Sequence, residues 1–108
     1  MEDLTIVLPE DPARVNQLKK KLEEYRSRLR EYVEKHDLTR NFDTECKMRI
    51  LDELLKNKIV RLSELEHDYS ANDPRALPYV YNAFAVIQDY ALTGGQNVDL
   101  SRGTGLPK

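Results

Sequence analysis

The sequence predicts an all-α protein built on a long antiparallel helical hairpin. A shorter third helix would complete a three-helix-bundle-like domain with extended N- and C-terminal tails. Two observations favour this fold class. Apolar residues recur at steps of three and four over two long segments, which is the spacing of one helix face. The pairs Asp11-Pro12 and Asp73-Pro74 supply helix start signals, because aspartate caps a helix and proline is tolerated at its first position.

The length of 108 residues fits one domain. We expect an N-terminal arm at residues 1–10, a helical domain at 11–93 and a C-terminal tail at 94–108. Hydrophobic residues make up 40% and charged residues 33% of the chain, so a core exists beneath a densely charged surface. A chain this short buries a modest share of its surface, and oligomerisation or docking on a partner would add stability.

Several features favour an intracellular, cytoplasmic location. Cys46 is the only cysteine, which excludes an intrachain disulfide and fits a reducing compartment. The start Met1-Glu2-Asp3-Leu4 lacks the basic and apolar regions of a secretory signal. The least polar stretch, residues 79–87, is too short to cross a bilayer, so no membrane association is expected.

The first two elements are an arm and a helix. The apolar patch from Leu4 to Leu8 ends at Pro9 and predicts either a strand-like arm or an extended segment that docks on a helix. A helix should follow at about residues 12–36. Its apolar stripe has the alternating spacing of heptad a and d positions and consists of Val15, Leu18, Leu22, Tyr25, Leu29 and Tyr32.

A second helix is expected at about residues 43–69. Lys58 interrupts one position of its apolar stripe, while Leu54 and Ile59 broaden the stripe, which indicates contact with more than one neighbour. The members of the stripe are Met48, Leu51, Leu55, Leu62, Leu65 and Tyr69.

A third helix is expected at about residues 74–92, with Pro78 in its first turns or at a kink. It is apolar on nearly every side between Tyr79 and Ala91, and such a helix is buried or lies at an interface. Glycines 94 and 95 predict its end. The polar tail at 96–108 has no periodicity and should be disordered unless a partner orders it.

The charges on the first two helices favour antiparallel packing. The heptad assignment sets Lys19 and Arg26 against a flank that contains Asp52 and Glu66. It also lets Arg14 approach Asp68. A parallel pairing of two copies of the first helix would instead oppose basic flanks. Exposed ion pairs contribute about 0–1 kcal/mol each, so these pairs would set register more than stability.

The opposite flank of the hairpin leaves basic residues unmatched. This stripe predicts a surface for an anionic partner, either nucleic acid or an acidic protein. The alternative is a solvated helix face with glutamates nearby, which is common. Aromatic residues are not interleaved with the basic ones, so single-strand stacking is not indicated. The candidate residues are Lys21, Arg28, Lys35, Lys47 and Arg61.

No motif predicts catalysis, a cofactor or a metal site. Glu64-x-x-His67 puts a carboxylate and an imidazole on one helix face, but a metal site of this kind needs further ligands. Cys46 lies near the start of the second helix, where the dipole could lower its pKa. A small structural residue is the favoured interpretation of Cys46. We therefore expect a protein that is not an enzyme.

Two functions remain open. The first is a non-catalytic adaptor or assembly protein that docks on a protein partner, or on a second copy, through the third helix and the tail. A phage particle is one setting for such a protein. The second is a small nucleic-acid-associated regulator that uses the basic residues above. Tyrosine and other large apolar side chains favour interfaces. The predicted partner-binding residues are Tyr79, Tyr81, Phe84, Val86, Ile87 and Tyr90.

Overall fold

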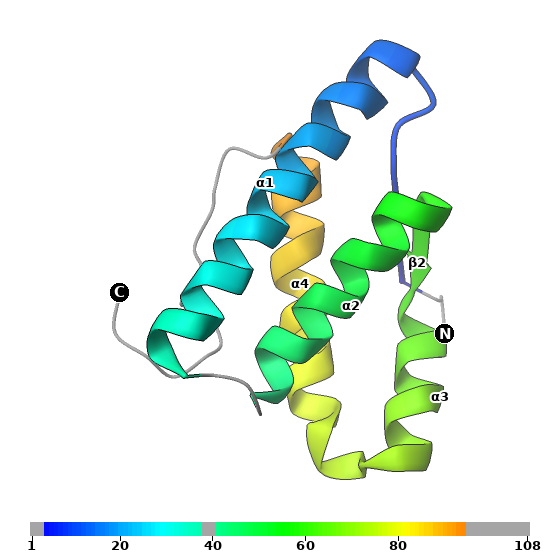
Figure 1. Ribbon diagram of the computed structural model, residues 1–108. Helices are drawn as coiled ribbons and strands as arrows, with labels where there is room; N and C mark the ends of the chain where they lie inside the picture. Colours follow the sequence, from blue (N-terminus) through cyan, green and yellow to red (C-terminus); the bar gives the residue numbers. More distant parts are fainter. Residues whose placement is uncertain (1–3, 38–40, 95–108) are drawn as a thin grey trace.

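The computed structural model describes residues 4–37 and 41–94 and confirms a mostly helical protein (Figure 1). The predicted tail at 96–108 lies outside these residues. The elements in chain order are β1 (Thr5–Val7), α1 (Pro12–His36), α2 (Phe42–Asn57), β2 (Ile59–Arg61), α3 (Leu62–Asn72), a short 3-10 helix η1 (Pro74–Ala76) and α4 (Leu77–Leu92).

Helix α1 begins and ends where the sequence predicts. The Asp11 carboxylate accepts a hydrogen bond from the Ala13 N–H at 3.0 Å, and Pro12 occupies the first helical position. Asp37 ends the helix in the left-handed region at φ 53°. The predicted stripe faces the core, and its buried members are Val15, Leu18, Leu22, Tyr25 and Leu29.

The prediction of one continuous helix over residues 43–69 was wrong. Lys58 adopts a left-handed conformation at φ 67°, and the Lys58 N–H closes α2 on the Leu54 carbonyl. The β-branched pair Ile59-Val60 then forms β2 before α3 begins at Leu62. The polar residue that interrupts the apolar stripe thus marks the break between two helices.

The N-terminal arm forms a strand, which was one of the two predicted outcomes. Strand β1 pairs antiparallel with β2, with Ile6 opposite Val60. Two further backbone bonds of 2.9 Å bracket the pair, from the Leu8 N–H to the Lys58 carbonyl and from the Leu62 N–H to the Leu4 carbonyl. Ile6 and Leu8 are buried, so the strand closes one side of the core.

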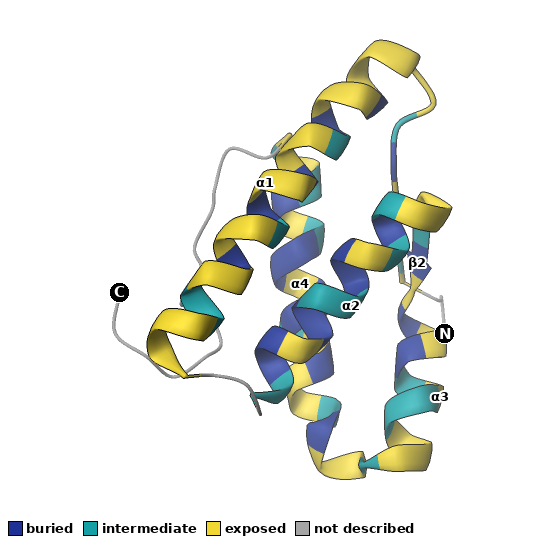
Figure 2. Ribbon diagram, viewed as in Figure 1, coloured by how far each residue is buried: buried dark blue, intermediate teal, exposed yellow. Residues whose placement is uncertain are grey.

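Helix α4 buries a broad face against the other helices, while Ala85 and Asp89 lie on its exposed side. Its most extensive contact is with α2, and it also packs against α3. Figure 1 shows α4 behind α1 and α2, and Figure 2 shows the buried faces of these helices turned inward. Tyr90 connects α4 to α1 by two contacts. Its hydroxyl donates to the Lys21 carbonyl at 2.8 Å, and its ring packs edge-on against the Tyr25 ring with 4.7 Å between the ring centroids.

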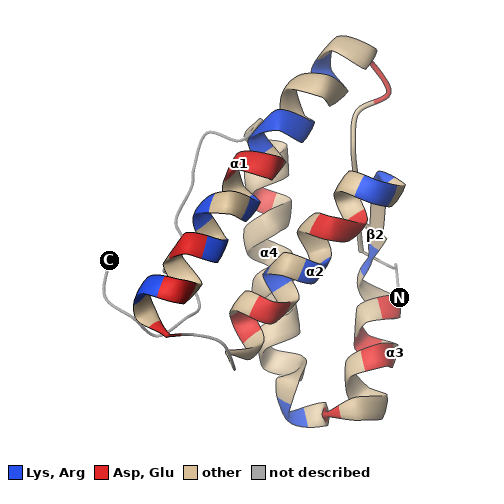
Figure 3. Ribbon diagram, viewed as in Figure 1, with Lys and Arg blue, Asp and Glu red and all other residues tan. Residues whose placement is uncertain are grey.

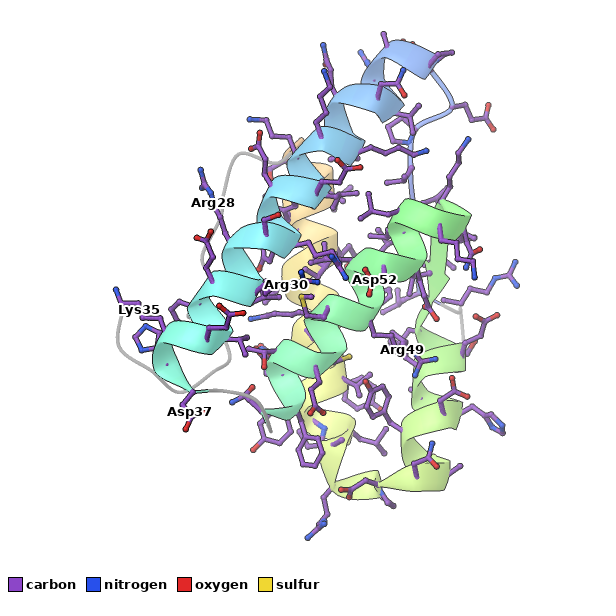
Figure 4. The ribbon with its side chains drawn as sticks, viewed as in Figure 1. Arg28, Arg30, Lys35, Asp37, Arg49 and Asp52 are labelled. Atoms are coloured by element: carbon purple, nitrogen blue, oxygen red, sulfur yellow. The ribbon has the colours of Figure 1, made fainter. Side chains whose placement is uncertain are left out.

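The predicted charge register between α1 and α2 is correct at one pair. Arg26 Nε lies 2.5 Å from Asp52 Oδ1. Figure 4 shows Asp52 on the side of α2 that faces α1. Asp68 does not meet Arg14 as predicted. It pairs with Arg49 of α2, because the break at Lys58 folds α3 back beside α2.

A buried ion pair lies where α2 meets α4. Lys47 Nζ is 2.7 Å from Asp43 Oδ2, and both side chains are fully buried. The Asn82 side-chain amide donates to Asp43 Oδ1 at 3.0 Å. Asp43 Oδ1 thus accepts a hydrogen bond from Asn82, while Oδ2 lies beside the Lys47 ammonium. Because both charges are buried, each depends on its partner.

We predict that Asp43→Leu lowers the free energy of unfolding by about 3–5 kcal/mol, because it leaves the Lys47 ammonium buried without its counter-ion. The double variant Asp43→Leu/Lys47→Met should recover most of this loss, since both charges are then gone. Urea unfolding followed by circular dichroism measures both variants. Losses that simply add in the double variant would show that the two charges do not depend on one another.

Candidate protein-docking surface

The structure places most of the predicted partner-binding residues in the protein's own core. Four of the six residues are at most 5% exposed, namely Phe84, Val86, Ile87 and Tyr90. The physical reason is that α4 has neighbouring helices on several sides. Its apolar character therefore reflects burial within the chain. Only Tyr79 and Tyr81 remain exposed, at 42% and 45%.

The two exposed tyrosines do not form one patch. They are two positions apart on a helix, so their side chains point to different sides. The Tyr79 ring lies 5.8 Å from the ring of Phe42 in α2. The Tyr81 hydroxyl donates to Glu66 Oε2 at 3.1 Å, and this hydrogen bond raises the pKa of Tyr81. Both rings are thus partly held by contacts within the chain.

The five predicted basic residues do not form one surface. Lys47 is buried against Asp43 and cannot contact an anionic partner, so its inclusion was wrong. Arg61 Nη1 lies 3.9 Å from Glu64 Oε1. Lys21, Arg28 and Lys35 are exposed on α1, and Figure 4 shows Arg28 and Lys35 pointing away from α2.

Acidic residues are interleaved with the basic ones along α1 (Figure 3). This mixture is typical of a solvated helix face. An anionic partner stays a prediction that depends on the three exposed residues of α1.

A groove lined mainly by apolar residues lies between β1 and the C-terminal end of α4, and we call it the β1–α4 groove. Its volume is about 250 Å³, and it is lined by Thr5, Ile6, Val7, Pro9, Leu18, Gln88, Ala91 and Leu92. Val7 is 60% and Leu92 81% exposed, and Leu4, just before β1, is 51% exposed. These are the largest exposures among the large apolar side chains that the structure describes.

Sequence reasoning missed the β1–α4 groove. Its walls come from three segments, near residues 5–9, 18 and 88–92, that only the fold brings together. The available signal was the apolar run from Leu4 to Leu8. An arm with so many apolar residues is expected to pack some of them against the rest of the protein. The others, here Leu4 and Val7, then stay exposed beside the packed ones.

A second hollow, between α2 and α3, is polar and centred on Arg49. The Arg49 guanidinium pairs with Asp68, lies 3.5 Å from Glu53 and stacks 5.5 Å from the Tyr69 ring centre. Figure 4 shows Arg49 on the α3 side of α2. The hollow also includes Glu64 and His67 and has a volume of about 380 Å³. Two carboxylates already neutralise its arginine, which leaves little attraction for an anionic ligand.

Over residues 4–37 and 41–94, no group of three or more His, Cys, Asp or Glu side chains is arranged to hold a metal ion.

The hydrogen bond and charge of Arg49 hold the pKa of Asp68 below its usual range.

Cys46 is a buried thiol rather than an activated one. Burial raises its pKa to about 12, and the hydrogen bond with Tyr69 only partly offsets this effect. Burial also raises the pKa of the Tyr69 hydroxyl, to about 12. The sequence suggested that the dipole of the second helix could lower the pKa of Cys46. Burial has the larger effect, because desolvation disfavours the thiolate, so Cys46 is not activated.

Comparisons with known proteins match the chain to none of the protein-family models, curated sequences or solved structures. None of the described helices is both long and apolar enough to cross a membrane.

We predict that Cys46 reacts with a thiol reagent at pH 8 only when the protein unfolds. The buried thiol is protonated and inaccessible in the folded state, whereas the unfolded thiol has an ordinary pKa. The rate of labelling by a chromogenic disulfide reagent should rise in parallel with the unfolded fraction as urea is added. Rapid labelling of the folded protein would contradict the burial of Cys46.

We predict that the stability of the protein depends on pH through Asp68. Its pKa is lowered in the folded protein, so its contribution to stability is present above the ordinary aspartate pKa and is lost as the pH falls through the folded value. Asp68→Asn should therefore make the free energy of unfolding less dependent on pH below about 4. Urea unfolding between pH 2.5 and 6 measures the slope, and an unchanged slope would rule out this linkage.

Proposed function

We propose that the protein is a non-catalytic adaptor or assembly protein that binds another protein through the β1–α4 groove and the apolar side chains around it. The observation that supports this function is the gathering of Val7 and Leu92, both mostly exposed, at one apolar groove. Large exposed apolar side chains that lie together are typical of protein interaction sites.

The polar groups elsewhere support a role without catalysis. Asp43 and Lys47 neutralise one another in the core, Asp68 is paired with Arg49, and Cys46 is buried with a raised pKa. These side chains are engaged in holding the helices together. A catalytic group needs instead to meet a substrate with a pKa suited to proton transfer or attack.

The surface proposed here differs from the one expected from the sequence. The sequence pointed to the aromatic residues of α4, but most of these pack against α2, α3 and Tyr25 of α1. The proposed surface consists instead of apolar residues at the C-terminal end of α4 and on β1. The last turn of α4 keeps its place in the contact through Ala91 and Leu92, which both line the groove.

We predict that Leu92→Lys strongly reduces capture of the partner from the native source. A lysine at the rim of the groove would place a charge in the apolar contact, and a loss of about tenfold in affinity or more is expected. The matched control is Ser70→Lys, which adds the same charge at an exposed position of α3.

Tagged wild-type and variant proteins are compared in crosslinked co-purifications, with circular dichroism to show that both variants are folded. Equal recovery of the same partners by wild type and Leu92→Lys would contradict the proposed surface.

A further inference from the structure

Resting on the proposed function, we infer that the outer edge of β1 binds an extended segment of the partner protein as a third strand. The segment has an apolar centre and is flanked by lysine or arginine. The inference names both the binding mode and the chemistry of the partner.

The hydrogen-bond pattern of the sheet leaves one edge of β1 open. Leu4, Ile6 and Leu8 are the residues whose backbone groups face β2, as the register and the two bracketing bonds show. In an antiparallel pair the intervening residues direct their N–H and C=O to the opposite side. Thr5 and Val7 therefore present two donors and two acceptors at the outer edge. The sheet of the described chain has only two strands, so this edge has no strand beside it.

The β1–α4 groove borders that open edge. Thr5, Val7 and Pro9, the residues that alternate outward along the strand, all line it, as does Leu92 from the end of α4. A segment added to β1 would form backbone bonds with Thr5 and Val7 and place an apolar side chain in the groove. This is the recognition mode in which main-chain bonds give affinity and a pocket for alternate side chains gives specificity.

The outer edge of β2 is a poorer candidate for strand addition. Arg61 occupies an outward position there, and α3 begins at the next residue. A charged side chain on an edge is a common protection against strand addition. The five residues Leu4-Thr5-Ile6-Val7-Leu8 contain no charge. Pro9 then limits the open edge on its C-terminal side, because proline has no N–H to donate.

Charge indicates which segment would bind. Glu2, Asp3, Glu10 and Asp11 flank the apolar strand in the sequence, and the first basic residue is Arg14. A second copy would bring its own Glu10 and Asp11 to the same edge and so set acidic residues near acidic residues. Like charges at facing positions are unfavourable. A segment with basic flanks is favoured instead, and a second copy of this chain is disfavoured.

The experiment follows amide exchange by NMR in the full chain. In the free protein the Thr5 and Val7 amides should exchange quickly, while those of Ile6 and Leu8 are protected by β2. The probe is the synthetic peptide Lys-Lys-Val-Thr-Val-Thr-Val-Lys-Lys. We expect saturating peptide to slow exchange of the Thr5 and Val7 amides at least tenfold. No added protection of these two amides at millimolar peptide would overturn the inference.

Two variants test the backbone contact. Thr5→Pro removes an outward N–H but no bond to β2, and should weaken peptide binding at least tenfold. Thr5→Val keeps the N–H and should bind as the wild type does. Protection of Ile6 and Leu8 reports whether Thr5→Pro still folds. Equal binding by both variants would exclude strand addition.

Peptide modifications give a test that does not depend on the stability of a variant. One peptide is N-methylated at both threonines and another at the three valines. Only one alternating set can direct its N–H groups at β1, so one peptide should bind and the other should not. Equal binding would overturn the inference. A peptide with glutamate in place of lysine should bind at least tenfold more weakly, and equal affinity would overturn the proposed charge preference.

The occupant and the proposed function are tested separately. A concentration-dependent dimer in sedimentation that Thr5→Pro abolishes would show that a second copy takes the edge, which overturns the partner proposed here. If Leu92→Lys loses the co-purified partner while Thr5→Pro retains it, the proposed function stands and strand addition fails.

Discussion

The burial of α4 is the constraint on which the rest of the structure depends. This helix has sixteen residues and one charge, Asp89, and must be covered on several sides. A continuous helix over residues 43–69 would be about 40 Å long, whereas α4 is about 24 Å long. Such a helix would cover one side of α4 and extend well beyond it. The break at Lys58 instead lets α3 return along α4 and cover a second side.

The same constraint explains where polar groups are found inside the protein. Asn82 of α4 donates to Asp43 of α2, and Asp43 pairs with Lys47 of the same helix. Buried charges of this kind add little net stability, but a shift of one helix along the other would leave each of them unpaired. The cluster therefore fixes the register of α2 against α4, and the apolar residues around it supply the stabilisation.

Local signals in the sequence were enough to predict α1, its cap at Asp11 and the Arg26–Asp52 pair, because each depends on neighbours in one helix or on one helix pair. The break at Lys58 was not predicted, since lysine is an ordinary helix residue. Its left-handed conformation occurs where β2 leaves α2 to pair with β1, a contact between segments far apart in the sequence. The burial of Lys47 depends on Asn82 and Asp43 together, and the β1–α4 groove depends on three distant segments. Periodicity within one helix contains no information about either.

The open edge of β1 follows from the way the core is closed. Once Lys58 turns the chain into β2, the N-terminal arm can pair with it and bury Ile6 and Leu8, but only the inward half of its backbone groups is used. The arm is held by a three-residue ladder and two buried side chains, so it belongs to the less stable part of the fold. A ligand that binds the folded arm and not the unfolded chain must stabilise the fold by mass action. Binding of a ligand at this edge would therefore favour the state in which β1 is docked. Ile6 and Leu8 are buried in the core only in that state.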